Sequence, residues 1–295
     1  MKRLILSSIV AISLLGANAY AEATKVTSKS VSKSAVANAK SSANKQKSDV
    51  KVVKEAVESI VLVAETIKHI DENKKDEAIK SLEKAIGKIE VVLSNPKVPE
   101  LIPVDAKVVV NEFLGNSRAA ENAIITSIAL LTNKRVQEGR KIASSLVDEI
   151  DFSTVNIPLI SYPSSLKLAA KYLHDNKLKE AKAVLTTTLN TFVTVTQITP
   201  IGILKAQELI TAASKVAKDN KELALAHLAL AKESLKKDEV LGYVSTSETT
   251  YKVLNDEISK VEKEVRGKNK AEKLFEELIK KIKEFKEKAL SSVKK

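Results

Sequence analysis

Cysteine and tryptophan are absent from this chain of 295 residues, and tyrosine and phenylalanine occur only five times each. The absence of cysteine excludes disulfides, thiol catalysis and Cys-ligated zinc or iron–sulfur sites. Glycine and proline are also scarce, with seven and six copies, against usual shares of ~7% and ~5% of a chain. So few turn residues argue against an all-β fold and against a fold rich in βαβ units. Because aromatic residues make up 3% of the chain, the core has to be built from Leu, Ile, Val and Ala.

The chain is basic, with 49 Lys and Arg against 37 Asp and Glu and a formal net charge of +12. A strongly basic protein can indicate nucleic-acid binding. Here the cations are mostly lysines that alternate with Glu and Asp on predicted helix faces, with no aromatic platform beside them. We therefore interpret them as solvated helix faces and expect no nucleic-acid partner.

Residues 1–21 have the layout of a cleaved secretory signal peptide. Lys2 and Arg3 precede the apolar run of residues 4–15, and small residues at 17, 19 and 21 provide cleavage sites. The run is shorter than the ~20 apolar residues that span a bilayer, and no later stretch is long enough. We expect cleavage after Ala21, a periplasmic location and no integral membrane segment after cleavage. The alternative is an uncleaved N-terminal anchor.

Residues 22–49 are mostly Ser, Lys, Ala, Thr and Asn, with isolated valines at 26, 31 and 36. Such a stretch buries too little apolar area to offset its ordering entropy. We interpret it as a flexible linker. The alternative is a frayed helix, because residues 35–47 contain no helix breaker.

From residue 50 onward the apolar residues recur with a helical period. A 4-3-4-3 stripe runs from Val53 to Ile67, stops at residues 71–74 and resumes at Ala78, which indicates a helical hairpin. The same interruption recurs at an Asn-Lys pair three more times, and the four asparagines are Asn73, Asn133, Asn176 and Asn220. Asn tolerates the left-handed conformation that ends a helix. We interpret the units as helical hairpins in one bundle, with a regular repeat solenoid as the alternative.

Two segments between hairpins read as extended chain. Residues 104–110 alternate in polarity after Pro96, Pro99 and Pro103, and residues 152–160 are β-rich. They predict either a two-stranded patch or extended crossover loops.

The C-terminal third predicts further helices. Thr199 and Pro200 form a helix start, with Pro at the first helical position, and residues 245–248 form a capping box. Helical spacing then continues to Gly267, and a last amphipathic helix covers residues 270–292. We expect this helix to pack on the bundle; pairing with a second subunit and lying on a membrane surface are the alternatives.

The predicted fold is therefore all-α, with about four antiparallel helical hairpins, a C-terminal helical pair and room for the minor two-stranded β patch. The predicted divisions are residues 1–21 as signal peptide, 22–49 as linker, 50–266 as the helical domain and 267–295 as a C-terminal amphipathic helix.

No residue pattern in the sequence indicates a catalytic, cofactor-binding or metal-ligating site. His69, His174 and His227 are far apart, with no ligand spacing; we interpret the first two as helix-end residues and the third as a packing residue. No Gly-x-Ser-x-Gly elbow, phosphate loop or dinucleotide fingerprint occurs. Four tyrosines, Tyr162, Tyr172, Tyr243 and Tyr251, could line a pocket or be buried. We predict a protein that is not an enzyme and needs no cofactor.

Several short segments resemble the YfdX family of small secreted bacterial proteins. They are residues 76–78 (DEA), 103–106 (PVDA), 157–159 (IPL), 199–201 (TPI) leading to 205–210 (KAQELI), and 241–243 (LGY). The resemblance covers roughly residues 50–266. It implies a helical periplasmic protein that is associated with stress and acid tolerance in enterobacteria, with a capacity to oligomerise and no established catalysis. No site residue can be transferred from it.

We expect a non-catalytic periplasmic protein that binds an unknown protein partner or client in the envelope stress response, as a monomer or a homo-oligomer. The alternative is a small-molecule or lipid binder with an apolar cavity between helix pairs. An enzyme that uses acidic residues, such as a lytic glycosidase, is disfavoured because sugar sites usually stack on aromatic rings.

Overall fold

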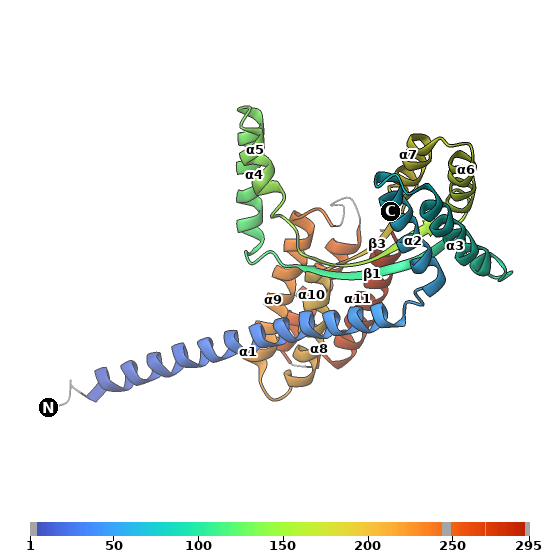
Figure 1. The fold of residues 1–295 in the computed structure, drawn as a ribbon. Coiled ribbons are helices and arrows are strands. Elements are labelled where there is room, and N and C mark those ends of the chain that lie inside the picture. The colour runs from blue at the N-terminus through green and yellow to red at the C-terminus, as the bar shows by residue number, and fades with distance from the viewer. Residues whose placement is uncertain (1–4, 244–248, 269, 293–295) are drawn as a thin grey trace. The chain divides into compact units, whose positions relative to one another are not determined.

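The computed structural model describes residues 5–243, 249–268 and 270–292, and it is mostly helical with one small antiparallel sheet (Figure 1). The chain divides into two compact units. Among the described residues, unit 1 comprises residues 5–42, 109–151 and 198–292, and unit 2 comprises residues 43–108 and 152–197. The predicted helical fold with a minor β patch is confirmed. The single bundle is not, because the hairpins are shared between two separate cores.

Unit 2 consists of two helical hairpins. They are α2 (Lys54–Asp71) with α3 (Lys75–Leu93), and α6 (Tyr162–His174) with α7 (Leu178–Leu189). Helix α3 packs on α6, and α2 packs on α7. The apolar stripes predicted from the sequence form this core, which includes Val63, Leu82, Ile89, Leu166, Leu173 and Leu185. The fully buried Tyr162 hydroxyl lies 3.2 Å from Ser59 Oγ, and burial raises the pKa of Tyr162 to about 12.

The turns of both unit 2 hairpins follow the prediction for asparagine. Asn73 and Asn176 are left-handed, with φ of 56° and 59°. The N–H of the next residue donates to the carbonyl five residues back, at 2.8 Å from Lys74 to His69 and 2.8 Å from Lys177 to Tyr172. This is the Schellman arrangement, which satisfies the last carbonyls of the first helix.

The other two asparagines behave differently. Between α4 (Ser117–Thr132) and α5 (Val136–Ala143) the left-handed residue is Lys134, with φ 61°, and not Asn133. Asn220 has φ −146° and caps α9 (Lys221–Val240), because its side chain accepts from the Leu223 N–H at 2.9 Å. The prediction of one asparagine role at all four turns is therefore wrong at these two. A short polar side chain serves a helix start as well as a helix end.

The core of unit 1 is formed by α8 (Ile201–Val216), α9, α10 (Thr249–Arg266) and α11 (Glu272–Ser292). Helix α8 packs on α9 and α11, and α10 packs on both α9 and α11. Phe275, Ile282 and Phe285 of α11 are buried, so the predicted packing of the C-terminal helix is confirmed.

The predicted capping box at residues 245–248 lies outside the described residues. None of the helices among the described residues combines the length and the apolar content that a membrane span requires.

Residues 22–49 differ from the expected flexible linker. They are the C-terminal part of α1 (Ile5–Asp49), and Val31 packs on the core of unit 1. Three small residues at helical spacing, Ser28, Ser32 and Ala35, are buried. Small side chains let a helix lie close to its neighbour, so this segment is ordered by tight packing rather than by aliphatic bulk. The segment has no aliphatic stripe, which is the pattern that predicts a packed helix.

The sheet has three strands in the order β1 (Leu101–Asn111), β2 (Glu149–Pro158), β3 (Val193–Pro200). The first two strands lie where the alternation predicted them, and the third was not predicted. Each strand contributes residues to both units. Because β3 extends to Pro200 and α8 begins at Ile201, this proline is the N-cap and not the first helical residue.

Candidate functional site

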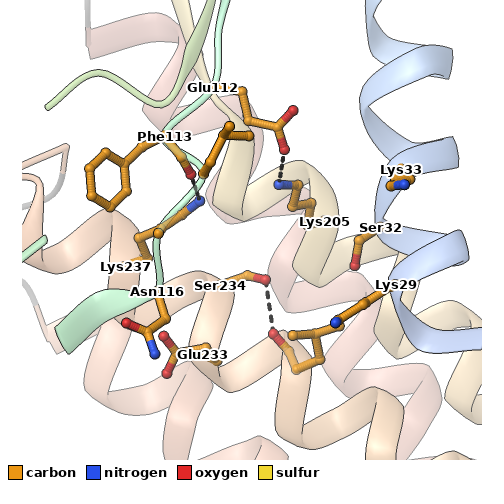
Figure 2. A pocket seen from close by; sticks show the side chains of 13 residues that line it. Lys29, Ser32, Lys33, Glu112, Phe113, Asn116, Lys205, Glu233, Ser234 and Lys237 are labelled. Carbon is orange, nitrogen blue, oxygen red and sulfur yellow. Dashed lines mark hydrogen bonds and ion pairs between the residues drawn. The ribbon is translucent and has the colours of Figure 1, made fainter. Parts of the chain in front are cut away.

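Unit 1 contains a cleft of about 370 Å³ (Figure 2). Its walls come from α1, from the loop after β1 and from α8 and α9. The lining residues are Lys29, Ser32, Lys33, Glu112, Phe113, Leu114, Gly115, Asn116, Lys205, Leu230, Glu233, Ser234 and Lys237. Clefts that hold small molecules measure ≈ 300–1,000 Å³, so this cleft is at the lower end of that range.

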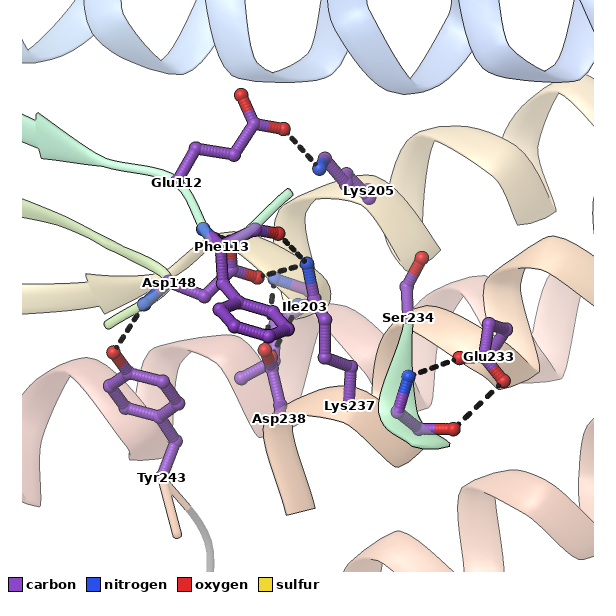
Figure 3. Close-up of polar contacts among 12 residues, drawn as sticks. Glu112, Phe113, Asp148, Ile203, Lys205, Glu233, Ser234, Lys237, Asp238 and Tyr243 are labelled. Carbon is purple, nitrogen blue, oxygen red and sulfur yellow. Dashed lines mark hydrogen bonds and ion pairs between the residues drawn. The ribbon is translucent and has the colours of Figure 1, made fainter. Parts of the chain in front are cut away.

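The charged groups of the cleft differ in whether they have partners. Lys205 Nζ lies 2.6 Å from Glu112 Oε1 (Figure 3), and Glu233 accepts from both the N–H and the hydroxyl of Ser117, at 2.6 and 3.2 Å. Lys29 and Lys33 are exposed, one helical turn apart on α1, and have no ionic partner among the described residues. The cleft therefore presents two free ammonium groups.

A buried ion pair lies beneath the cleft (Figure 3). Lys237 Nζ is 2.6 Å from Asp148 Oδ2 and donates to the Phe113 carbonyl at 3.2 Å. The Phe113 N–H donates to Asp148 Oδ1 at 3.0 Å. The lysine side chain is 7% exposed and the aspartate 0%. A pair this deep is tolerated only when its remaining hydrogen-bonding positions are filled, and both ends here bond to the loop that forms one wall of the cleft.

Asp238 caps the first turn of α8. Its carboxylate accepts from the Gly202 N–H at 3.1 Å and the Ile203 N–H at 2.8 Å, where the helix dipole favours negative charge. Burial, and then the nearby Asp148 charge, raise the pKa of Asp238 to about 8. A Cβ on Gly202 would lie inside contact distance of the Asp238 carboxylate, so glycine is required where α9 meets α8.

Tyr243 completes the network from the end of α9. Gly242, with φ 83°, forms a Schellman turn in which the Tyr243 N–H donates to the Asp238 carbonyl at 3.1 Å. The Tyr243 hydroxyl accepts from the Asp148 N–H at 2.8 Å, and burial raises the pKa of this tyrosine. Burial also raises the pKa of Glu149, which follows Asp148 in the chain. These contacts fix the start of β2 against α9.

The histidines lie where the sequence predicted. His69 and His174 are in the last turns of α2 and α6. His227 is 2% exposed, its Nδ1 lies 2.9 Å from Ser28 Oγ of α1, and burial lowers its pKa. Within the described ranges, no group of three or more His, Asp or Glu side chains could hold a metal ion.

The tyrosines do not line a common pocket among the described side chains. Tyr162 belongs to the core of unit 2 and Tyr243 to the network of unit 1.

The sequence pattern did not predict the roles of Asp148, Lys237 and Asp238, because charged residues are usually solvated. One signal was available, since Asp238 continues the 3-4 spacing of the buried Leu228, Ala231 and Leu235.

The α4–α5 hairpin of unit 1 carries an exposed apolar face. Ile125, Ile128, Leu131 and Val136 are 65%, 57%, 44% and 50% exposed. Ile125 and the neighbouring Ile124 also border an open groove with Val240 of α9. The two helices approach closely through small residues, since Ser127 Oγ donates to the Gly139 carbonyl at 2.9 Å. We call these four exposed side chains the hairpin face.

Comparison with known proteins identifies a family for the middle of the chain. The family model described as YfdX protein matches residues 56–198. Over these residues the chain is similar to the YfdX family. A solved structure of YfdX from Salmonella Typhi is similar at 13% identity over 51% of this chain and 93% of that chain, with a TM-score of 0.35. None of the curated proteins matches the chain. Lys29, Lys205 and the α9 residues of the cleft lie outside the matched residues.

Proposed function

We propose that this protein is a member of the YfdX family, is exported to the periplasm, is not an enzyme, and binds a protein partner or client during envelope stress. The layout of residues 1–21 supports export, and the family resemblance supports the stress role. The observation that carries the binding function is the exposed hairpin face.

The hairpin face differs from the corresponding surfaces of the other hairpins. Hairpins α2–α3 and α6–α7 bury their apolar stripes against each other. In α4 and α5 the buried residues are small: Ala120, Ser127 and Gly139. Contiguous apolar groups left in water are typical of interaction surfaces. A charged pair, Lys236 with Glu239 at 3.1 Å, lies on the groove beside the face, and a polar rim around an apolar centre is usual for an interface.

The buried charges of unit 1 support a non-catalytic role. Asp238 caps α8, Asp148 pairs with Lys237, and Tyr243 bonds to backbone. Each of these groups already holds two segments of the fold together, so each has a structural task that accounts for its burial.

The mature chain, residues 22–295, tests the binding function directly. We expect it to suppress the aggregation of thermally unfolded citrate synthase, measured by light scattering, because apolar segments of the client cover the hairpin face. I125S/I128S should lose most of this protection. The matched control is V61S/V91S, which removes two similarly exposed valines, 53% and 58%, from unit 2. Equal protection by both variants, or none from the wild type, contradicts the proposal.

Cell fractionation with N-terminal sequencing tests the location, and an N-terminus other than Glu22 contradicts the predicted cleavage.

A second candidate function is small-molecule binding, and the cleft of unit 1 is the observation that favours it. Its position differs from the expected cavity between helix pairs, because α1 and the loop after β1 form two of its walls. Its lining also differs from the expected apolar one, because it contains lysines as well as apolar side chains.

A further inference from the structure

We propose that the cleft of unit 1 binds an anionic amphiphile, a molecule with a single carboxylate or similar head group on an apolar body. This inference rests on the second candidate function and names its ligand class. It is built from three features of the lining: unpaired cations, an apolar wall and hydroxyls that are already engaged.

The cations argue for a negative head group. Four lysines line the cleft, but Lys205 is neutralised by Glu112 and Lys237 by Asp148. Lys29 and Lys33 lie four residues apart on one face of α1 and have no such partner among the described residues. Figure 2 shows both on the α1 side of the cleft, opposite Phe113 and Lys237. A head group between them would gain two ion pairs without breaking an existing one.

The negative groups of the lining do not cancel this preference. The Glu233 carboxylate is held by the N–H and hydroxyl of Ser117 at the start of α4, and Glu112 is held by Lys205. An ammonium ligand would have to compete for carboxylates that are already bonded. A carboxylate ligand meets lysines that are free.

The opposite wall argues for an apolar body. Phe113, Leu114 and Leu230 line the cleft, and Leu114 is 91% exposed. A Cβ on Gly115 would lie 2.5 Å from Phe113 Cε1, so glycine allows the ring to lie back against the loop. Covering these side chains removes apolar surface from water, which favours a ligand with a hydrocarbon portion.

The remaining polar groups of the lining do not favour a neutral polar ligand. Ser32 Oγ donates to the Ser28 carbonyl at 3.1 Å, and Ser234 Oγ donates to the Leu230 carbonyl at 2.8 Å. Both hydroxyl protons are used within their own helices. The two lysines are therefore the charged groups of the lining that remain available to a ligand.

The test is calorimetric titration of the mature chain with decanoate, and with decylamine and decanol as probes of the same length. We expect decanoate to bind best. K29A/K33A should weaken decanoate binding about tenfold, the scale of two partly exposed charge interactions, while leaving decanol unchanged. The matched control is K25A/K40A, which removes two exposed lysines of α1 that do not line the cleft and should change decanoate affinity less than about twofold.

Each other outcome overturns the inference. Equal losses in the two lysine variants would indicate a diffuse surface charge. Binding of decylamine as tight as that of decanoate would exclude an anion preference. If anionic phospholipid vesicles bind through Lys29 and Lys33 while decanoate does not, the surface binds a membrane and not a free amphiphile.

The same experiment distinguishes a failure of this inference from a failure of either proposed function. If the wild type binds none of the three probes, the second candidate function fails with it. If the probes bind without charge selectivity, only the ligand class fails. I125S/I128S should still bind decanoate and K29A/K33A should still protect the client, because the hairpin face and the cleft share no residue.

Discussion

Asp238 and Gly202 show how much of unit 1 depends on single residues. The carboxylate satisfies two N–H groups at the start of α8, and the glycine makes room for it. A buried carboxyl group with a raised pKa has a measurable consequence for stability. Burial and the Asp148 charge hold the pKa of Asp238 at about 8. The positive charge nearby belongs to Lys237, which is paired with Asp148.

The first prediction concerns pH. Asp in an unfolded chain has a pKa of about 3.9, so between that value and about 8 the folded state binds one more proton than the unfolded state. The free energy of unfolding should therefore fall as the pH rises through this window. Asp238→Asn keeps an acceptor for the backbone but cannot ionise, so its stability should fall less steeply with pH. Urea titrations at pH 5 and pH 8 measure both slopes. Identical slopes for wild type and variant would refute the assignment.

The second prediction concerns the glycines. Gly202→Ala should lower the free energy of unfolding by about 1–3 kcal/mol, because the new methyl group has to displace the Asp238 carboxylate or the Ser234 carbonyl. Gly87→Ala is the control, since it lies in helix α3 and, apart from its chain neighbours and the backbone of its own helix, no atom lies within 4 Å of the added Cβ. It should be neutral or stabilising by up to about 1 kcal/mol. Chemical denaturation measures the free energy of unfolding of both variants, and equal changes would contradict the close contact at Gly202.

At the level of elements, one turn geometry ends α2, α4, α6 and α9. Each turn has a left-handed residue followed by an N–H that donates five residues back: Asn73, Lys134, Asn176 and Gly242 are the left-handed residues. Three of these four are residue types that tolerate this conformation, and lysine is not.

The third prediction follows from that exception. Lys134→Gly should raise the free energy of unfolding by up to about 1 kcal/mol, because a positive φ is strained for lysine and not for glycine. Asn133→Gly, one residue earlier, should give no such gain, since that residue has φ −83° and its side chain bonds to Ala129. Thermal unfolding of the two variants distinguishes them, and a gain at Asn133 but not at Lys134 would contradict the turn assignment.

The helical hairpins could be predicted from the sequence because aliphatic residues with a 3.6-residue period leave a clear pattern. The ordered part of α1 could not, because Ser28, Ser32 and Ala35 have no hydrophobic signal and are buried only through close packing. Strand β3 is short and gains its partners from β2, far away in the sequence. The cleft was missed for the same reason, since its lysines become distinctive only when distant segments enclose them.

At the level of the whole molecule, the two units are interleaved along the chain. Unit 2 is nearly complete within residues 50–198, whereas unit 1 needs segments from both ends of the sequence. The residues that match the YfdX family therefore include most of unit 2 and only the middle segment of unit 1.

The fourth prediction uses this division. A fragment of residues 50–198 should keep the unit 2 core and its slow amide exchange in α2, α3, α6 and α7. Helices α4 and α5 should exchange fast in the fragment, because α9, against which α4 packs, is missing. Hydrogen–deuterium exchange with mass spectrometry measures both, and the full-length mature chain is the control. Fast exchange throughout the fragment would show that unit 2 depends on unit 1.

The interleaved order also determines how the chain can mature when it emerges from a ribosome or a translocase N-terminus first. Residues 22–42 and 109–151 have no complete core to join until residues 198–292 have followed. Unit 2 can therefore form its core early. The buried face of α1 and the Asp148 carboxylate stay exposed to solvent until the last third of the polypeptide has been made. A truncated product therefore carries both surfaces uncovered, which makes it a natural target for chaperones and proteases.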